Sequence, residues 1–205
     1  MLEQGGGAGV GSVSMEYADL ERLLATQRAV RLFASRPVDD AVIETIIAAA
    51  TRAPSARNSQ PWRFVVIRER ATKERLGEVF DELGSQMYGA GAPERTPWGD
   101  VPVLIAVTSE YAFGSTESGL AAPGASIYPA VQNLLLAAHS LGLGSVLTTR
   151  WKAREAEVRP LLGLPETMAV HAIIPLGYPA ERMGKNRRRA ASEVTYRERF
   201  GAPWN

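Results

Sequence analysis

Residues 54–62 read Pro54-Ser55-Ala56-Arg57-Asn58-Ser59-Gln60-Pro61-Trp62 and join a predicted helix to a predicted strand. The helix, expected over residues 39–52, carries apolar residues at helical spacing behind a possible aspartate cap. The strand, expected over residues 63–68, is a β-branched and aromatic run typical of a buried strand. We therefore expect helices and strands to share one core, with this polar loop at a junction between them.

Amide and hydroxyl groups make this loop unusual. Asn58 and Gln60 each carry two N–H donors and one carbonyl acceptor, and Ser55 adds a hydroxyl. Such groups can hydrogen-bond the edge of a planar heteroaromatic ring. The alternative is a tight helix-to-strand turn in which the polar groups only satisfy the backbone. The loop by itself does not decide between these two hypotheses.

Composition excludes several classes of chemistry. The chain has 205 residues, is 45% hydrophobic and carries a net charge of +1, which is typical of a globular protein without a general affinity for nucleic acid or membranes. It has no cysteine, so disulfides, thiolate metal sites and cysteine nucleophiles are excluded. His139 and His171, the two histidines, lie in apolar segments and are interpreted as structural. We predict no metal site.

The order of the predicted elements favours an α+β fold. Strands alternate with helices, but the last strand leads into an extended tail, which argues against a strict doubly wound sheet. We expect residues 1–15 to be a disordered N-terminal lead and residues 16–205 to form one domain with a C-terminal extension. No apolar run is long enough to span a membrane and no secretory signal is visible, so a cytoplasmic location is expected. The predicted helices cover residues 16–27, 39–52, 71–88, 126–141 and 153–162, and the predicted strands cover residues 63–68, 101–107, 145–147 and 168–176.

Two arginine-bearing segments are candidates for binding phosphate. The glycines form neither a GxGxxG nor a GxxxxGK[ST] pattern, so a bound phosphate would depend on arginines. Arg28 and Arg31 follow the first helix, and Lys185-Asn186-Arg187-Arg188-Arg189 lies in the tail. Arginine's planar fork suits a phosphate dianion. A solvated basic run or a nucleic-acid patch is the alternative for the tail, although the near-neutral net charge weakens the latter.

Taken together, four segments resemble the FMN-dependent nitroreductase family. They are RAVRLF (28–33), PSARNSQPWRF (54–64), ASIYPAVQNLLLAAHSLGLGSVLTT (125–149) and a final GYPAE…RRR…EVTYRERFG (177–201). The resemblance covers residues 16–201. It implies an α+β sandwich with a mixed, mainly antiparallel central sheet flanked by helices. It also implies an intertwined homodimer with FMN at the subunit interface and a small-molecule acceptor as substrate.

The resemblance implies a role for each residue that matches a family motif. The first basic segment contacts the phosphate and the ring in the family, and Arg31 is the candidate for stabilising charge at N1 and O2 of the flavin. The loop at 54–60 lines the isoalloxazine, residues 147–149 lie near N5, and the tail arginines form a second phosphate clamp. Gln27, Ala29 and Thr149 depart from residues common in the family. The implied cofactor-binding residues are Arg28, Ala29, Arg31, Pro54, Ser55, Ala56, Asn58, Gln60, Leu147, Thr148, Thr149, Arg188 and Arg189, with Lys185 and Arg187 as additions.

The implied mechanism depends on the cofactor more than on the protein. We hypothesise a ping-pong cycle in which NADPH or NADH gives a hydride to flavin N5 and an electron-poor acceptor, such as a nitroaromatic or a quinone, takes electrons at the same face. No side chain is assigned a catalytic role. The loops at 89–99 and 113–124 are expected to shape the acceptor pocket. Candidate stacking groups are Trp98, Tyr111 and Phe113, and Arg150 and Trp151 come directly after Thr149. Each of these five side chains is more often ordinary packing than a substrate contact.

Two other functions remain open on the sequence. One is a relative of the same fold that dehalogenates its substrate or fragments its flavin with oxygen. The other is a non-catalytic protein that binds or stores FMN. The composition of residues 89–99 gives no reason to favour the first, and flavin reduction by NAD(P)H would exclude the second.

Overall fold

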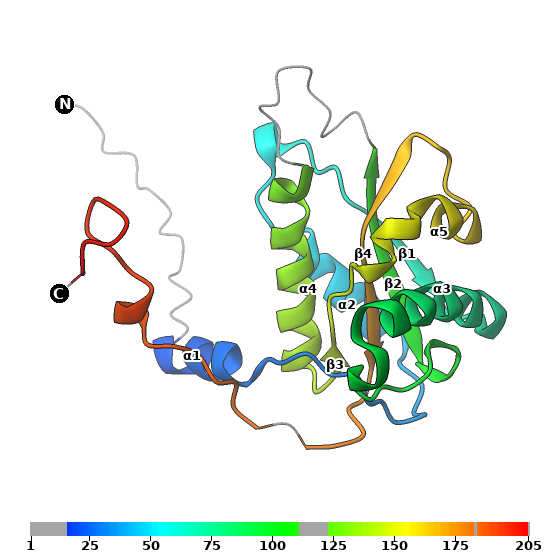
Figure 1. Cartoon of the computed structure of the whole chain (residues 1–205), viewed down its shortest axis with the longest axis horizontal. Coiled ribbons are helices and arrows are strands. Elements are labelled where there is room, and N and C mark those ends of the chain that lie inside the picture. The colour runs from blue at the N-terminus through cyan, green and yellow to red at the C-terminus, as the bar shows by residue number, and fades with distance from the viewer. Residues whose placement is uncertain (1–15, 111–122, 183, 205) are drawn as a thin grey trace, which may run out of the picture.

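The computed structural model of the chain describes residues 16–110, 123–182 and 184–204 (Figure 1). At its centre lies a four-stranded antiparallel sheet in the order β1-β2-β4-β3. The strands are β1 (Arg63–Ile67), β2 (Val103–Glu110), β3 (Gly144–Ser145) and β4 (Met168–Gly177). The helices are α1 (Tyr17–Thr26), α2 (Asp40–Ala50), α3 (Arg70–Tyr88), α4 (Tyr128–Ser140) and α5 (Glu155–Leu161). The expected α+β class and the antiparallel sheet are confirmed.

Both faces of the sheet are covered by helices. Because side chains alternate along a strand, Val103 and Ile105 of β2 face one core while Leu104 and Ala106 face the other. The first core is completed by apolar side chains of α2 and α4, and the second by those of α3 and α5. Figure 1 shows α2 and α4 on one side of the sheet and α3 and α5 on the other. This burial on both faces explains why β2 and β4 are nearly continuous apolar runs.

Some expected boundaries differ from those observed. The strand expected at 145–147 is only a two-residue element, β3, followed by an isolated bridge between Thr148 and Ile173. The helix expected at 153–162 is preceded by a 3-10 turn over Arg150–Arg154, and α5 proper begins at Glu155. Residues 89–99, expected as a loop or lid, end in a packed turn: Trp98 is buried and stacks on Phe80 with ring centroids 4.5 Å apart. Trp98 is therefore a core residue, which agrees with the interpretation of this side chain as ordinary packing.

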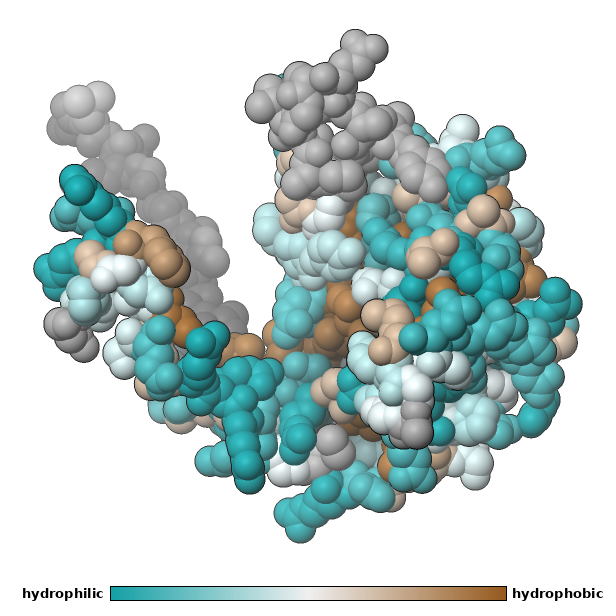
Figure 2. Space-filling view, in the orientation of Figure 1, coloured by the Kyte–Doolittle hydropathy of each residue, from teal (hydrophilic) through white to brown (hydrophobic). Residues whose placement is uncertain are grey.

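An arm made of α1 and the C-terminal tail stands away from the body (Figure 1). Asn186 fixes the tail to α1, because its backbone N–H donates to Ala25 O at 2.8 Å and its side chain donates to Leu24 O at 2.8 Å. No residue of α1 is buried, although the helix is amphipathic. Figure 2 shows an open recess between this arm and the body. The expectation that the tail docks is met along α1, but the tail's own apolar side chains remain exposed, namely Val194, Tyr196, Phe200 and Trp204.

No helix among the described residues has the length and the apolar character needed to cross a membrane. The expected N-terminal lead at 1–15, and Tyr111 and Phe113 of the expected acceptor pocket, lie outside the described residues.

Candidate functional site

The segment that carries Arg28 and Arg31 is held against the edge of the sheet. Ala29 forms a parallel bridge with Ser145 of β3, and Val30 N donates to Ser145 O at 3.0 Å. Val30 is buried over Gly144, where a Cβ would lie 2.6 Å from a Val30 methyl carbon. A glycine at this position therefore permits the close approach of the two backbones.

Hydrogen bonds fix the same segment around Arg31. Arg31 O accepts from Thr96 N at 2.9 Å, and Phe33 N donates to Thr96 Oγ1 at 2.9 Å. On the other side, Leu32 O accepts from Ala180 N at 3.0 Å. The backbone of Arg31 is thus set by contacts before and after it, while its side chain is exposed. Thr96 is a positioning residue that the sequence gave no reason to single out.

The two arginine-bearing segments meet in one open pocket. It measures about 620 Å³ and is lined by Arg28, Ala29, Arg31, Lys185, Asn186, Arg187 and Arg188. We call it the basic pocket. Its lining includes five cations and no carboxylate, and none of the five is in an ion pair with a described residue. Arg189, predicted to belong to the phosphate clamp, is not part of the lining.

The loop at 54–60 is a strained turn. Arg57, Asn58 and Gln60 have φ angles of 53°, 53° and 47°, in the left-handed region that side-chain-bearing residues seldom adopt. Ser55 Oγ accepts from Gln60 N at 3.0 Å, and Ala56 N donates to Ser126 Oγ at 3.0 Å. The turn hypothesis thus accounts for the Ser55 hydroxyl. It does not account for the side chains of Asn58 and Gln60, which are exposed and make no hydrogen bond to another described residue. A strained backbone that exposes the amide donors of Asn58 and Gln60 is typical of a binding loop.

This loop and the basic pocket lie at opposite ends of α4. The loop contacts Ser126, just before α4 begins, whereas Thr26 Oγ1 lies 2.8 Å from His139 Nε2 in the last turn of α4. Thirteen helical residues separate the two ends by about 20 Å. None of the predicted ring-binding residues from Pro54 to Gln60 lines the basic pocket. A single chain therefore does not bring the two halves of the predicted site together.

The predicted residues at 147–149 follow β3, and Thr148 forms a bridge with Ile173 of β4. Leu147 is exposed, while Thr148 is buried and its hydroxyl donates to Ile173 O at 2.5 Å. That hydroxyl is committed to the sheet. Thr149 is half-buried and precedes the 3-10 turn at Arg150. Trp151 is fully buried and donates to Thr148 O at 3.2 Å, so its role is structural.

Arg31 and Thr148 also line a second, smaller cavity, of about 150 Å³, that extends under α3. Its lining includes Arg95 and Arg150, which were not among the predicted site residues. Burial, and then the charge of Arg150, lowers the pKa of Arg95 from its ordinary value. Arg95 forms an ion pair with Asp81. Arg150 was weighed from the sequence as a neighbour of Thr149, whereas Arg95 carries no motif and only the fold brings it to this cavity.

Both histidines make hydrogen bonds to hydroxyl groups. Ser109 Oγ lies 2.8 Å from His171 Nε2 in the core, and Thr26 makes the equivalent contact to His139. Burial lowers the pKa of each imidazole. The described residues contain no group of three or more potential metal-ligating side chains.

A sheet with helices on both faces, and a basic pocket at its edge without a carboxylate, define an α+β protein with a site suited to a multiply charged anion. Comparison with known proteins names the class. The model of the Nitroreductase family matches residues 24–178, and the chain belongs to this family. It is therefore an oxidoreductase of the nitroreductase type, a class of FMN flavoproteins.

Three similar proteins illustrate the range of the family. A protein of Methanothermobacter thermautotrophicus, provisionally named NADH dehydrogenase/NAD(P)H nitroreductase, is 37% identical over 168 residues, which cover 81% of this chain and 80% of that protein. A provisionally assigned nitroreductase of Desulfovibrio desulfuricans, solved in complex with FMN, is 28% identical with a TM-score of 0.68, covering 88% of this chain and 97% of that one. An iodotyrosine deiodinase, solved with FMN and 3-iodo-L-tyrosine, is 26% identical with a TM-score of 0.69, covering 84% and 96%.

Proposed function

We propose that this protein is an FMN-dependent NAD(P)H oxidoreductase that reduces nitroaromatic, quinone or similar electron-poor acceptors. The observation that carries the proposal is the basic pocket, in which five cations face one space without a carboxylate. Such a donor set fits the phosphate of FMN, because arginine binds phosphate oxygens through paired, charge-assisted hydrogen bonds. The fit favours a phosphorylated flavin over riboflavin.

Under this proposal, the residues of the basic pocket bind and orient FMN. Arg28, Arg188 and the neighbouring cations of the basic pocket hold the phosphate, and Asn186 keeps the tail in place. When bound, FMN supplies hydride transfer between NAD(P)H and the acceptor. Arg31, whose backbone Thr96 fixes, places positive charge where the reduced ring system is electron-rich. Protons come from water in this proposal, because no side chain is assigned as a general acid.

We further propose that the site is completed by a second copy of the chain. The loop at 54–60 and the basic pocket lie toward opposite ends of α4, a helix about 20 Å long, so in this proposal each needs its complement from elsewhere. The arm supports a homodimer, since Phe200 is 92% exposed and Val194 and Trp204 are about half exposed. Apolar side chains on a projecting arm are typical of a surface that another protein covers. The recess beside the arm leaves room for a second copy (Figure 2).

The test is reduction of the FMN-loaded protein. Purified protein, saturated with FMN and freed of excess, is mixed with NADH or NADPH without oxygen, and the visible flavin absorption is followed. Loss of this absorption excludes a protein that only stores FMN, and acceptors are then screened by the rate at which they restore it. A protein that cannot be loaded with FMN would contradict the proposal.

Reductive dehalogenation is the second candidate. Its support is the likeness to an iodotyrosine deiodinase at a TM-score of 0.69 over 84% of this chain. The FMN-loaded, reduced protein is incubated with 3-iodo-L-tyrosine, and iodide is measured. Iodide release at a rate above that of nitroaromatic reduction would favour this candidate over the first.

A further inference from the structure

The arm meets the body through a short contact between the ends of two helices. Thr26 Oγ1, in the last turn of α1, lies 2.8 Å from His139 Nε2, in the last turn of α4 (Figure 1). Among the described residues, this is the one hydrogen bond that joins α1 to α4. No residue of α1 is buried, so apolar packing contributes little to the docking of this helix. The contact therefore restrains α1 relative to the body.

The distances decide which partner donates the hydrogen. Thr26 Oγ1 also lies 2.7 Å from Arg22 O. Two oxygens at this distance need a hydrogen between them, and a carbonyl has none, so the Thr26 hydroxyl donates to Arg22 O. Thr26 Oγ1 then accepts from His139 Nε2. Burial lowers the pKa of His139, so at pH 7 the imidazole is neutral and its single N–H lies on Nε2.

Arg28 lies between two anchors of the backbone. The first is Thr26, two residues before it. The second is Val30, two residues after it, which is buried and donates from its backbone N–H to Ser145 O at 3.0 Å. Without the contact to His139, the segment that carries Arg28 would be held to the body on one side alone.

Arg28 also lines two pockets at once. One is the basic pocket, and the other is a neighbouring cavity of about 370 Å³, which we call the hinge cavity and which is also lined by His139. The charged groups that face His139 there are the guanidinium groups of Arg28 and Arg182 and the carboxylate of Glu181. A cationic donor would repel both guanidinium groups. A neutral imidazole supplies the hydrogen without this repulsion.

We propose that His139 is a positioning residue of the phosphate site: it donates through Nε2 to Thr26 and thereby orients Arg28 toward the phosphate of FMN. This inference rests on the proposed function, because the phosphate is that of FMN. A merely structural histidine at the end of α4 would stabilise the fold, and its loss would weaken every flavin alike. A positioning histidine acts on the phosphate alone.

The variants are chosen by where the donor atom falls. The amide nitrogen of glutamine can take the place of Nε2, whereas that of asparagine, one methylene shorter, reaches the place of Nδ1. His139→Gln is expected to bind FMN within about twofold of wild type, and His139→Asn to bind it about three- to tenfold more weakly, the range for one neutral hydrogen bond.

The acceptor is tested in the same way. Thr26→Val is expected to weaken FMN as much as His139→Asn does, and the double variant no further, because both substitutions remove one interaction. Thr45→Val is the matched control, since its hydroxyl also donates to a carbonyl four residues back, on α2, far from the arm in the chain. It is expected to leave FMN affinity unchanged.

Fluorescence titrations of the flavin-free chain with FMN and with riboflavin separate positioning from stability. We expect the losses for FMN alone, since riboflavin lacks the phosphate. Equal losses for both flavins would overturn the proposal, as would FMN affinity that His139→Asn and Thr26→Val leave unchanged. A His139→Gln protein as weak as His139→Asn would overturn it too.

A second measurement needs no flavin. Nitrogen NMR of the flavin-free chain reports which ring nitrogen of His139 carries the hydrogen, and a spectrum of His171→Gln assigns the signals because the chain has two histidines. We expect the hydrogen on Nε2, and a hydrogen on Nδ1 would contradict the proposal. Wild-type protein that fails to bind FMN refutes the proposed function, whereas variants that bind FMN as well as wild type does refute this inference alone.

Discussion

Replacing Arg188 by methionine removes one of the five cations of the basic pocket while leaving its backbone and most of its volume in place. Arg189, next to it, carries the same charge but does not line the pocket. The pair therefore separates a local contact with the phosphate from a general effect of net charge. Both arginines are exposed, so neither substitution is expected to lower the free energy of unfolding appreciably.

The magnitude follows from the exposure of Arg188. A hydrogen bond to a charged group contributes about 1.5–3 kcal/mol, which corresponds to roughly a 10- to 150-fold change in Kd. Because the side chain is solvated and four other cations remain, we expect the lower end, about a tenfold weaker affinity for FMN. Exposed charges are screened by salt, so the difference between wild type and Arg188→Met is expected to shrink as ionic strength rises.

The assay is a fluorescence titration of the flavin-free protein with FMN and, in parallel, with riboflavin, which lacks the phosphate. Arg188→Met is expected to weaken FMN and leave riboflavin unchanged, whereas Arg189→Met is expected to change neither more than about twofold. An Arg188→Met protein that discriminates FMN from riboflavin as well as wild type does would refute the phosphate assignment. Equal losses of FMN affinity in Arg188→Met and Arg189→Met would show that the effect comes from net charge and not from a contact with the phosphate.

Three further predictions concern the frame of the site and its assembly. Gly144→Ala places a methyl group 2.6 Å from Val30 and is expected to cost about 1–3 kcal/mol of unfolding free energy and to weaken FMN, as measured by urea denaturation and flavin titration; an unchanged midpoint would show that the two backbones are not in close contact. Burial lowers the pKa of His171 in the folded state, so below about pH 6.5 the unfolded chain takes up a proton that the folded chain does not, and stability falls as the pH decreases. His171→Gln is expected to flatten this loss, at most about 1.4 kcal/mol per pH unit, in thermal unfolding at pH 7 and pH 5, and a slope identical to wild type would contradict the assignment. Finally, co-expressed chains carrying Arg28→Met with Arg188→Met and Asn58→Ala with Gln60→Ala are expected to restore one FMN site per mixed dimer, whereas a site built within one chain would regain none.

The sequence predicted the helices and strands better than the long-range contacts between them. The apolar runs of β2 and β4 and the helical spacing before Pro54 are local signals, and the structure confirms the elements that they predict. The strand expected at 145–147 is longer than the observed β3, because only Gly144 and Ser145 pair with β4 as a strand and the next pairing is an isolated bridge at Thr148. Trp98 was placed in a loop because the residues before it lack periodicity, whereas its stacking on Phe80 is a long-range contact.

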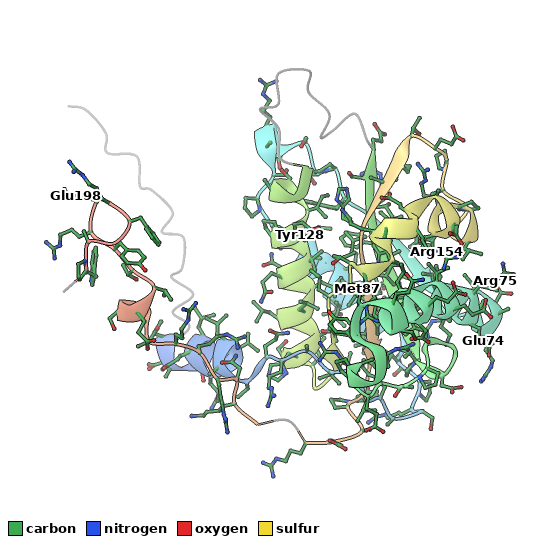
Figure 3. The ribbon with its side chains drawn as sticks, viewed as in Figure 1. Glu74, Arg75, Met87, Tyr128, Arg154 and Glu198 are labelled. Carbon is green, nitrogen blue, oxygen red and sulfur yellow. The ribbon has the colours of Figure 1, made fainter. Side chains whose placement is uncertain are left out.

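The candidate site was predictable only in part. Arg28 and Arg31 line one pocket with the tail because Asn186 makes two hydrogen bonds to α1. These long-range hydrogen bonds cannot be predicted from the sequence. The left-handed φ angles of Asn58 and Gln60, and the distance of their loop from the basic pocket, are likewise properties of the three-dimensional chain. The far end of the arm, marked by Glu198 in Figure 3, extends away from the body, which the composition of the tail did not indicate.

Anaerobic reduction of the FMN-loaded protein tests the central claim most directly. The proposal of an FMN-dependent NAD(P)H oxidoreductase predicts that NADH or NADPH abolishes the visible flavin absorption, and that a nitroaromatic or quinone then restores it without oxygen. Flavin absorption that persists with both nicotinamide cofactors, in a protein shown to hold FMN, would contradict it.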